Sequence, residues 1–156
     1  TVRVQLREMM AAHGQKDGQL VEDQAQELLA KFGFTEPKRI LDSFPFELSG
    51  GMQQRVGVAA AMLLKPKILM ADEPTSALDV TVQKQVIEEM LLVRELFGTA
   101  ILLVTHNIGV IRAMADKMLV MREGETVEYG AAKDLLEHPQ ADYTRKLLAA
   151  VPRIRR

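Results

Sequence analysis

The sequence predicts an α/β protein in which an N-terminal helical subdomain precedes a mainly parallel sheet. In the first part, apolar residues recur every three or four positions, which predicts helices over 2–12, 20–32 and 52–64. From Lys67 onward, short apolar runs alternate with helical periodicity, which predicts strand 68–71, helix 80–97, strand 100–105 and helix 108–115. Such alternation is typical of parallel strands joined by right-handed crossovers.

The last third of the chain predicts a hairpin and two short helices. Strands 117–122 and 125–129 are separated by Glu123 and Gly124, which suit a tight turn. Gly130 then precedes a short helix that ends at Leu136. A final helix is predicted over about 140–151 from its apolar spacing.

Composition limits the classes of function. The chain has 156 residues, of which 47% are hydrophobic and 26% charged, enough for one modest domain. A net charge of −1 gives no field for nucleic acid, so we expect no nucleic-acid partner. The absence of cysteine excludes disulfides and thiolate metal sites. The longest apolar stretch, 56–64, is far shorter than the roughly 20 residues that span a bilayer, so we expect membrane attachment only through a partner.

A predicted loop over 42–45 leads to a motif that opens a helix. Ser49 is a good N-cap for the predicted helix, and the two glycines that follow allow a ligand to approach the backbone. A phosphate at this helix start would be held by the Ser49 hydroxyl and by the amides of Gly50 and Gly51. An ordinary capped helix has the same pattern, so the motif alone leaves both interpretations open.

Two adjacent carboxylates end the first predicted strand. The apolar run 68–71 suits a strand that is buried on both faces, and Asp72 and Glu73 follow it where ligands bind in α/β sheets. Because side chains alternate along a strand, neighbouring acids are suited to different tasks. Asp72 can hold Mg²⁺ through its water shell, while Glu73 meets an attacking water molecule. The alternative is a solvated acidic strand end.

His106 follows the next predicted strand, 100–105. We therefore expect it at the same edge of the sheet as Asp72 and Glu73. A single histidine at a strand end is more often structural, but the accompanying motifs favour a functional role for His106.

Taken in order, these motifs resemble those of an ATP-binding cassette (ABC) ATPase. The run from Leu48 to Arg55 resembles the signature, 68–74 the Walker B strand, 76–79 the D-loop, and His106 the switch histidine. The ending, with its His-Pro pair at 138–139 and the run 143–152, is similar to ATPase subunits of the oligopeptide, dipeptide and nickel importers. Met52 replaces a common Gln and Asn107 a common Asp.

The resemblance implies a partial P-loop NTPase core in three segments: a helical subdomain with the signature helix (1–64), the C-terminal part of the α/β core (65–136) and a family extension (137–156). It implies ATP and Mg²⁺ as cofactors. Glu73 would polarise the attacking water, His106 would sense the γ-phosphate and Asp72 would hold Mg²⁺. The residues that would contact the partner's ATP or line the dimer seam are Leu48, Ser49, Gly50, Gly51, Met52, Ala77 and Asp79.

Further expectations follow from the same resemblance. The partners would be a second ABC ATPase subunit, identical or paralogous, and transmembrane permease subunits, at the cytoplasmic face of the inner membrane. The transported solute would be a peptide first, with nickel and other small solutes behind it.

The motifs that a complete cassette carries upstream have no counterpart here. The sequence contains no Gly-Lys dipeptide, so it lacks a phosphate-binding loop, and it also lacks a glutamine loop. We therefore expect a C-terminal fragment that hydrolyses no ATP by itself. Two alternatives stay open: a non-catalytic module that acts through its dimer seam, and a soluble cassette ATPase of DNA repair or translation. The latter would not be expected to carry the ending at 143–152.

Overall fold

The computed structural model describes residues 1–76 and 78–150. The chain divides into two units, Thr1–Leu103 and Val104–Arg156, which are described separately. Ala77, which was predicted to line a dimer seam, lies outside the described residues, as do residues 151–156 with the predicted end of the last helix.

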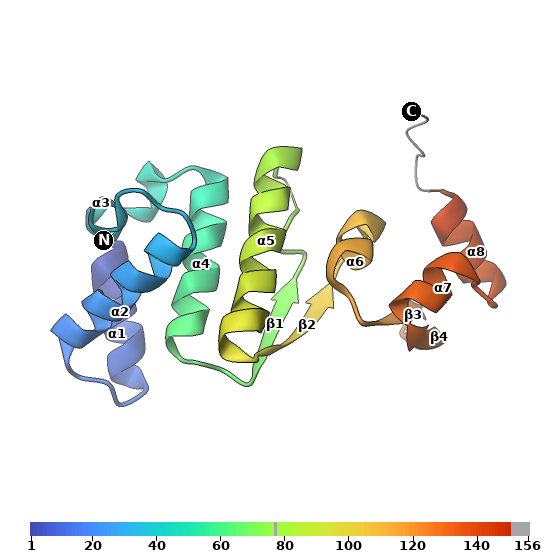
Figure 1. Ribbon diagram of the computed structural model, residues 1–156, viewed down its shortest axis with the longest axis horizontal. Helices are drawn as coiled ribbons and strands as arrows, with labels where there is room; N and C mark the ends of the chain where they lie inside the picture. The colour runs from blue at the N-terminus through green and yellow to red at the C-terminus, as the bar shows by residue number, and fades with distance from the viewer. Residues whose placement is uncertain (77, 151–156) are drawn as a thin grey trace. The chain divides into compact units, whose positions relative to one another are not determined.

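The first unit consists of helices and two strands (Figure 1). Its elements are α1 (Val2–Ala12), α2 (Gly18–Lys31), α3 (Pro37–Asp42), the 3₁₀ turn η1 (Pro45–Glu47), α4 (Gly50–Leu63), β1 (Ile68–Asp72), α5 (Val80–Phe97) and β2 (Ala100–Val104), whose last residue begins the second unit.

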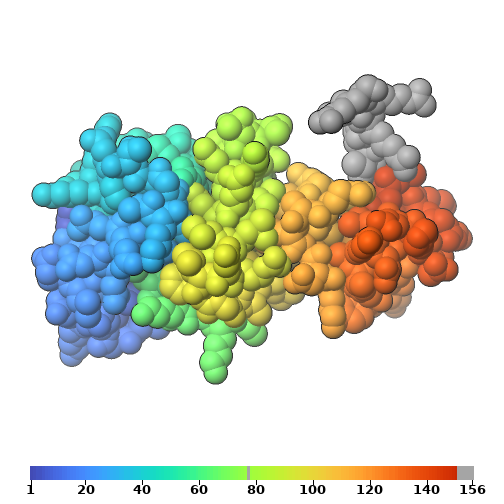
Figure 2. Space-filling model, in the orientation of Figure 1, coloured from blue at the N-terminus to red at the C-terminus, as the bar shows by residue number. Residues whose placement is uncertain are grey.

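One apolar core holds the first unit together. Helix α2 packs on α1, α3 and α4, and α4 packs on α5. The core contains Leu29, Leu41, Met62 and Val93, each of which is almost fully buried. The space-filling view shows these helices closely packed against one another (Figure 2). Burial of such side chains contributes about 1.5–3 kcal/mol each.

The predicted helices of the first unit are confirmed, and one further helix is present. Helix α1 has the predicted bounds, while α2 begins two residues early because the Asp17 carboxylate accepts hydrogen bonds from the amides of Gln19 and Leu20. Sequence reasoning missed α3, which begins with Pro37 at its first turn and so had a recognisable start signal. The predicted loop over 42–45 is therefore shorter, since it lies between α3 and η1.

Strands β1 and β2 form a parallel pair, as the alternating pattern predicts. The Ala100 amide donates to the Lys67 carbonyl over 2.9 Å, which places the two strand starts side by side, and both arrows run the same way in Figure 1.

The prediction of a strand buried on both faces is wrong for β1. Leu69 is buried against the core, but Ile68 is 62% exposed and Met70 74% exposed. In β2, Leu102 is also 53% exposed, while Ile101 packs on the core. The reason is that the core covers one face of the pair only, which leaves an apolar face open.

The second unit pairs a hairpin with short helices. Its elements are α6 (Ile108–Met114), β3 (Lys117–Arg122), β4 (Glu125–Ala131), α7 (Ala132–Glu137) and α8 (Asp142–Ala149). Strands β3 and β4 are antiparallel, and Arg122 is opposite Glu125. The predicted hairpin turn is confirmed, since Glu123 and Gly124 have φ values of 52° and 83°. The small core is formed by Met118, Val120, Ala132 and Leu135 with Ile108.

Gly130 lies inside β4 rather than after it. A methyl group at Gly130 would come within 2.7 Å of the Leu135 side chain, so the glycine allows α7 to pack closely on the strand that precedes it. Among the described residues, no helix is long and apolar enough to cross a membrane.

Candidate functional site

The start of α4 is fixed by its own side chains. Ser49 is extended, and its hydroxyl oxygen accepts a hydrogen bond from the Met52 amide at 3.3 Å. The Gln53 side-chain amide donates to the carbonyls of Pro45 and Leu48 at 2.8 and 3.0 Å, which ties the preceding turn to the helix. Leu48 is buried, whereas Ser49 is exposed. The predicted N-cap is confirmed.

The two glycines at this helix start have different surroundings. A methyl group at Gly51 would come within 2.4 Å of the Val82 side chain on α5, so Gly51 is needed for close packing of two helices. A methyl group at Gly50 would meet nothing within 4 Å. Gly50 is exposed, and its surface is therefore available to a group from outside the chain.

The end of β1 contains a bent backbone. Asp72 is the last residue of the strand and is exposed. Glu73 has φ = 47°, in the left-handed region that side chains other than glycine and asparagine rarely adopt, and its carbonyl accepts a hydrogen bond from the Ser76 amide at 3.0 Å. Such a conformation costs about 1–3 kcal/mol and is concentrated at functional sites.

Asp79 caps the start of α5. Its carboxylate accepts hydrogen bonds from the amides of Thr81 and Val82, each at 3.0 Å, and the Gln83 side chain donates to the Leu78 carbonyl at 3.0 Å. The Val82 side chain occupies the position that a side chain on Gly51 would take, so the starts of α4 and α5 lie together. The structure thus brings the signature-like motif next to the residues that follow 76–79.

His106 belongs to the second unit, where it is exposed between β2 and α6. The next residue, Asn107, caps α6, since its side-chain oxygen accepts a hydrogen bond from the Gly109 amide at 2.9 Å. The backbone amide of Asn107 donates to the Thr105 hydroxyl at 3.0 Å. Asparagine and aspartate are equally good N-caps, which explains the residue at 107. A place for His106 beside Asp72 and Glu73 stays a prediction.

The acidic end of β1 suits a Mg²⁺ ion that is shared with substrate phosphates better than a metal ion whose ligands are all protein side chains. Across residues 1–76 and 78–150, no group of three or more His, Cys, Asp or Glu side chains could hold a metal ion. Mg²⁺ usually keeps several waters and takes one or two carboxylates with substrate phosphates. A single exposed carboxylate at a strand end, such as Asp72, suits that chemistry.

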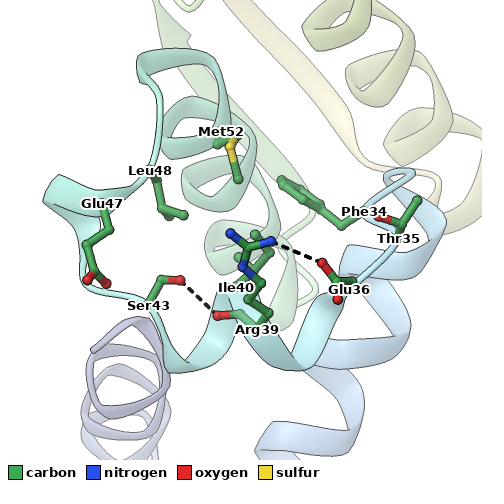
Figure 3. A pocket seen from close by; sticks show the side chains of 9 residues that line it. All are labelled: Phe34, Thr35, Glu36, Arg39, Ile40, Ser43, Glu47, Leu48 and Met52. Atoms are coloured by element: carbon green, nitrogen blue, oxygen red, sulfur yellow. Dashed lines mark hydrogen bonds and ion pairs between the residues drawn. The ribbon is translucent and has the colours of Figure 1, made fainter.

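A pocket of about 510 Å³ lies beside the start of α4 (Figure 3). Phe34, Leu48 and Met52 line it with apolar surface. The Arg39 guanidinium on the wall pairs with the Glu36 carboxylate at 3.2 Å. Near it, Phe44 and Phe46 stack with ring centroids 5.3 Å apart, and Phe46 is 80% exposed. An open hollow with an exposed aromatic pair suits a protein segment better than a small charged ligand.

Comparison with known proteins decides the family. A family model described as "ABC transporter" matches residues 2–76. The chain is 42% identical over 153 residues to the peptidoglycan transport ATP-binding protein YejF of Agrobacterium fabrum, covering 98% of this chain and 28% of that protein. It is 41% identical over 150 residues to the oligopeptide transport ATP-binding protein OppD of Haemophilus influenzae, covering 96% and 46%.

A third relative, the oligopeptide transport ATP-binding protein OppF of Lactococcus lactis, is 47% identical over 118 residues, covering 76% of this chain and 37% of that protein. The chain belongs to the ABC transporter family. It spans less than half the length of these curated relatives. The "ABC transporter" match contains Ser49, Gly50, Asp72 and Glu73 and ends before Asp79 and His106.

One feature of this ABC transporter chain was missed by sequence reasoning. Arg55, at the end of the signature run, donates to the Glu89 carboxylate on α5, and both side chains are largely buried. Burial raises the pKa of Glu89, although the hydrogen bond and charge of Arg55 act to lower it. A signal was present, because Glu89 lies on the apolar face of α5 with Val86 and Val93.

Proposed function

We propose that this chain is part of the ATP-hydrolysing subunit of an ABC importer that transports peptides. The proposal is carried by one observation: the Ser49 helix start and the acidic end of β1 occur in one unit of a chain that aligns over 98% of its length with a transport ATP-binding protein. Peptide is the proposed solute because two of the compared relatives are named for oligopeptide transport.

Ser49 and Gly50 would meet the γ-phosphate of ATP held by a partner subunit. Both residues are exposed, and the first amides of a helix have no partner within the helix and so suit an anion. This backbone would be held in place by its neighbours Leu48, Gly51 and Met52. Leu48 is buried, Gly51 packs beside Val82, and the Met52 amide donates a hydrogen bond to the Ser49 hydroxyl.

The catalytic roles would fall to the groups at the strand ends. Asp72 would hold Mg²⁺, which neutralises charge on the phosphates when it is bound. Glu73 would accept a proton from the attacking water. Its left-handed backbone conformation would direct the carboxylate differently from the side chains that alternate along the strand. His106 would hydrogen-bond the γ-phosphate.

The partners would be a second ABC ATPase subunit and transmembrane permease subunits, at the cytoplasmic face of the inner membrane. Asp79 would line the seam between ATPase subunits together with Ala77, which lies outside the described residues. The helical subdomain, 1–64, would face the permease, and the pocket beside Phe34 with the exposed Phe46 supplies an apolar surface there.

Glu73→Gln in the full-length ATPase tests the proposal. The amide cannot take a proton from water, so kcat is expected to fall by ~10²–10⁴ while ATP stays bound. Steady-state phosphate release and equilibrium ATP binding measure the two quantities. Glu88→Gln, an exposed change on α5, is the matched control and should keep full turnover. Undiminished turnover in the Glu73 variant would remove this residue from the role of base.

A further inference from the structure

The Arg55 side chain joins three segments of the first unit. Its Nε donates to the Glu89 carboxylate on α5, and a terminal nitrogen donates to the Phe32 carbonyl at the end of α2. The guanidinium carbon also lies 4.3 Å from the centroid of the Phe34 ring. The Arg55 side chain is 14% exposed and that of Glu89 is 6% exposed, so the pair is largely withdrawn from water.

The pair lies along the same seam as the Gly51 contact. Helices α4 and α5 stand side by side and start at the same end of the unit (Figure 1). Gly51 and Val82 meet near the two helix starts. Arg55 follows Gly51 by one turn and Glu89 follows Val82 by two, so the ion pair forms a second contact further along the seam. Two separated contacts therefore join α4 to α5.

The chemistry of this contact suits positioning better than simple packing. Well-packed apolar residues of similar volume often hold a seam as well as a buried ion pair does, or better. Here one Glu89 oxygen, Oε2, is buried with no hydrogen-bond partner among the described residues. What an ion pair adds is direction, because the planar guanidinium bonds only in fixed geometry to the carboxylate, the carbonyl and the ring.

We propose that Arg55 and Glu89 are a positioning pair for ATP hydrolysis, which hold Ser49 and Asp79 in a fixed relation at the adjacent starts of α4 and α5. This inference rests on the function proposed above. Neither residue touches the nucleotide; each acts through the helix that carries it. A loosened pair would leave the ATP bound by the partner subunit in place but would misalign the groups that close over its phosphate.

Glu89→Gln in the full-length, assembled ATPase tests the inference. The change keeps the shape but removes the charge that orients Arg55, so kcat is expected to fall about tenfold or more, because small misplacements of positioning groups cost up to ~10²-fold. The KM for ATP should stay within about twofold, since a positioning fault acts after binding. Glu88→Gln, at the neighbouring exposed position, should leave both constants unchanged.

Arg55→Lys provides the second arm. Lysine keeps the positive charge beside Glu89 but cannot bond the carboxylate and the Phe32 carbonyl in the same planar geometry, so it should also lower kcat selectively. The double variant Arg55→Lys/Glu89→Gln should lose no more than the stronger single variant, because the two side chains act as one unit. If Glu89→Gln fails to fold, the Arg55→Lys kcat decides by the same criterion.

Two results would overturn the inference. One is a kcat for Glu89→Gln equal to that of Glu88→Gln. The other is a loss of ATP binding and melting temperature with an unchanged kcat per folded molecule, which would make the pair merely structural. The Glu73→Gln experiment keeps the two proposals apart: turnover that does not depend on Glu73 removes its proposed role as base, whereas Glu73-dependent turnover with a normal Glu89 variant removes only the positioning role.

Discussion

Gly50 and Gly51 are neighbours in the chain but have different tasks. Of the two, Gly51 lies against another helix, and a methyl group added to it would come within 2.4 Å of the Val82 side chain. Gly50 has open space around it. Their difference cannot be read from the sequence, where both simply permit close approach. In the structure, one glycine serves packing between helices and the other leaves a surface free.

Gly51→Ala is therefore expected to lower the free energy of unfolding by about 1–3 kcal/mol, because the methyl group overpacks the seam between α4 and α5. Gly50→Ala is the matched control, and its effect should be below ~1 kcal/mol and of stabilising sign, since alanine favours a helix. Urea unfolding followed by circular dichroism measures both. Equal destabilisation by the two substitutions would contradict the assignment.

At the scale of elements, side-chain caps mark the starts of α2, α4 and α5. Asp17, Ser49 and Asp79 each stand just before a helix and accept hydrogen bonds from first-turn amides. The Ser49 cap was predicted from residue type and position, whereas the Asp17 cap was missed and the start of α2 was placed two residues late. Contacts between elements could not be recognised in this way. The Arg55–Glu89 pair joins residues 34 positions apart, and only the packing of α4 on α5 brings them together.

The exposure of Ile68 and Met70 shows that burial, too, is hard to predict from a local pattern. Their apolar run correctly predicts a strand, but the number of covered faces depends on what packs there, and no local pattern carries that information. Helix α3 was missed for a different reason: with six residues it is too short for a clear period, and its proline start was the only strong signal.

One carboxylate anchors the start of helix α8 to the hairpin. Glu128 on β4 accepts hydrogen bonds from the amides of Gln140 and Ala141, at 2.8 and 3.2 Å, just before the helix. The Thr144 hydroxyl and these amides hold the pKa of Glu128 below its ordinary value of 4.5. The start of α8 is thereby anchored to β4 by a carboxylate.

This anchor should weaken in acid. Because the pKa of Glu128 is lowered in the folded state, its contribution to stability is present above about 4.5 and is lost as the pH falls through the lowered value. Glu128→Gln should therefore speed hydrogen exchange of the α8 amides at pH 7, and the difference from the native chain should shrink in acid. Glu125→Gln, at the hairpin end of the same strand, is the control. Exchange in α8 that does not depend on residue 128 would contradict this role.

At the scale of the molecule, the first unit carries an apolar face that its own helices do not cover. Ile68, Met70 and Leu102 are each more than half exposed on the adjacent strands β1 and β2. Apolar residues that are scattered singly are ordinary on a protein surface, whereas a contiguous apolar group on neighbouring strands promotes association.

The 156-residue chain by itself is expected to bind a hydrophobic dye and to self-associate through this face. Met70→Lys should reduce both dye fluorescence and the apparent mass in sedimentation, because it places a charge in the middle of the apolar group. Val4→Lys, at a single exposed apolar position on α1, is the control. If the two variants behave alike, association does not use the β1–β2 face.

The side-by-side starts of α4 and α5 also have an electrostatic consequence. A helix carries about half a positive charge at its start, so two helices that begin at one end of a unit bring like partial charges together. Neither helix has an acidic residue in its first turn, and Asp79 offsets the charge at α5, while α4 is capped by neutral Ser49. An anion that arrives at Ser49 would relieve a repulsion already present in the folded chain. Under the proposed function, the phosphate of a partner subunit's nucleotide would supply this counter-charge.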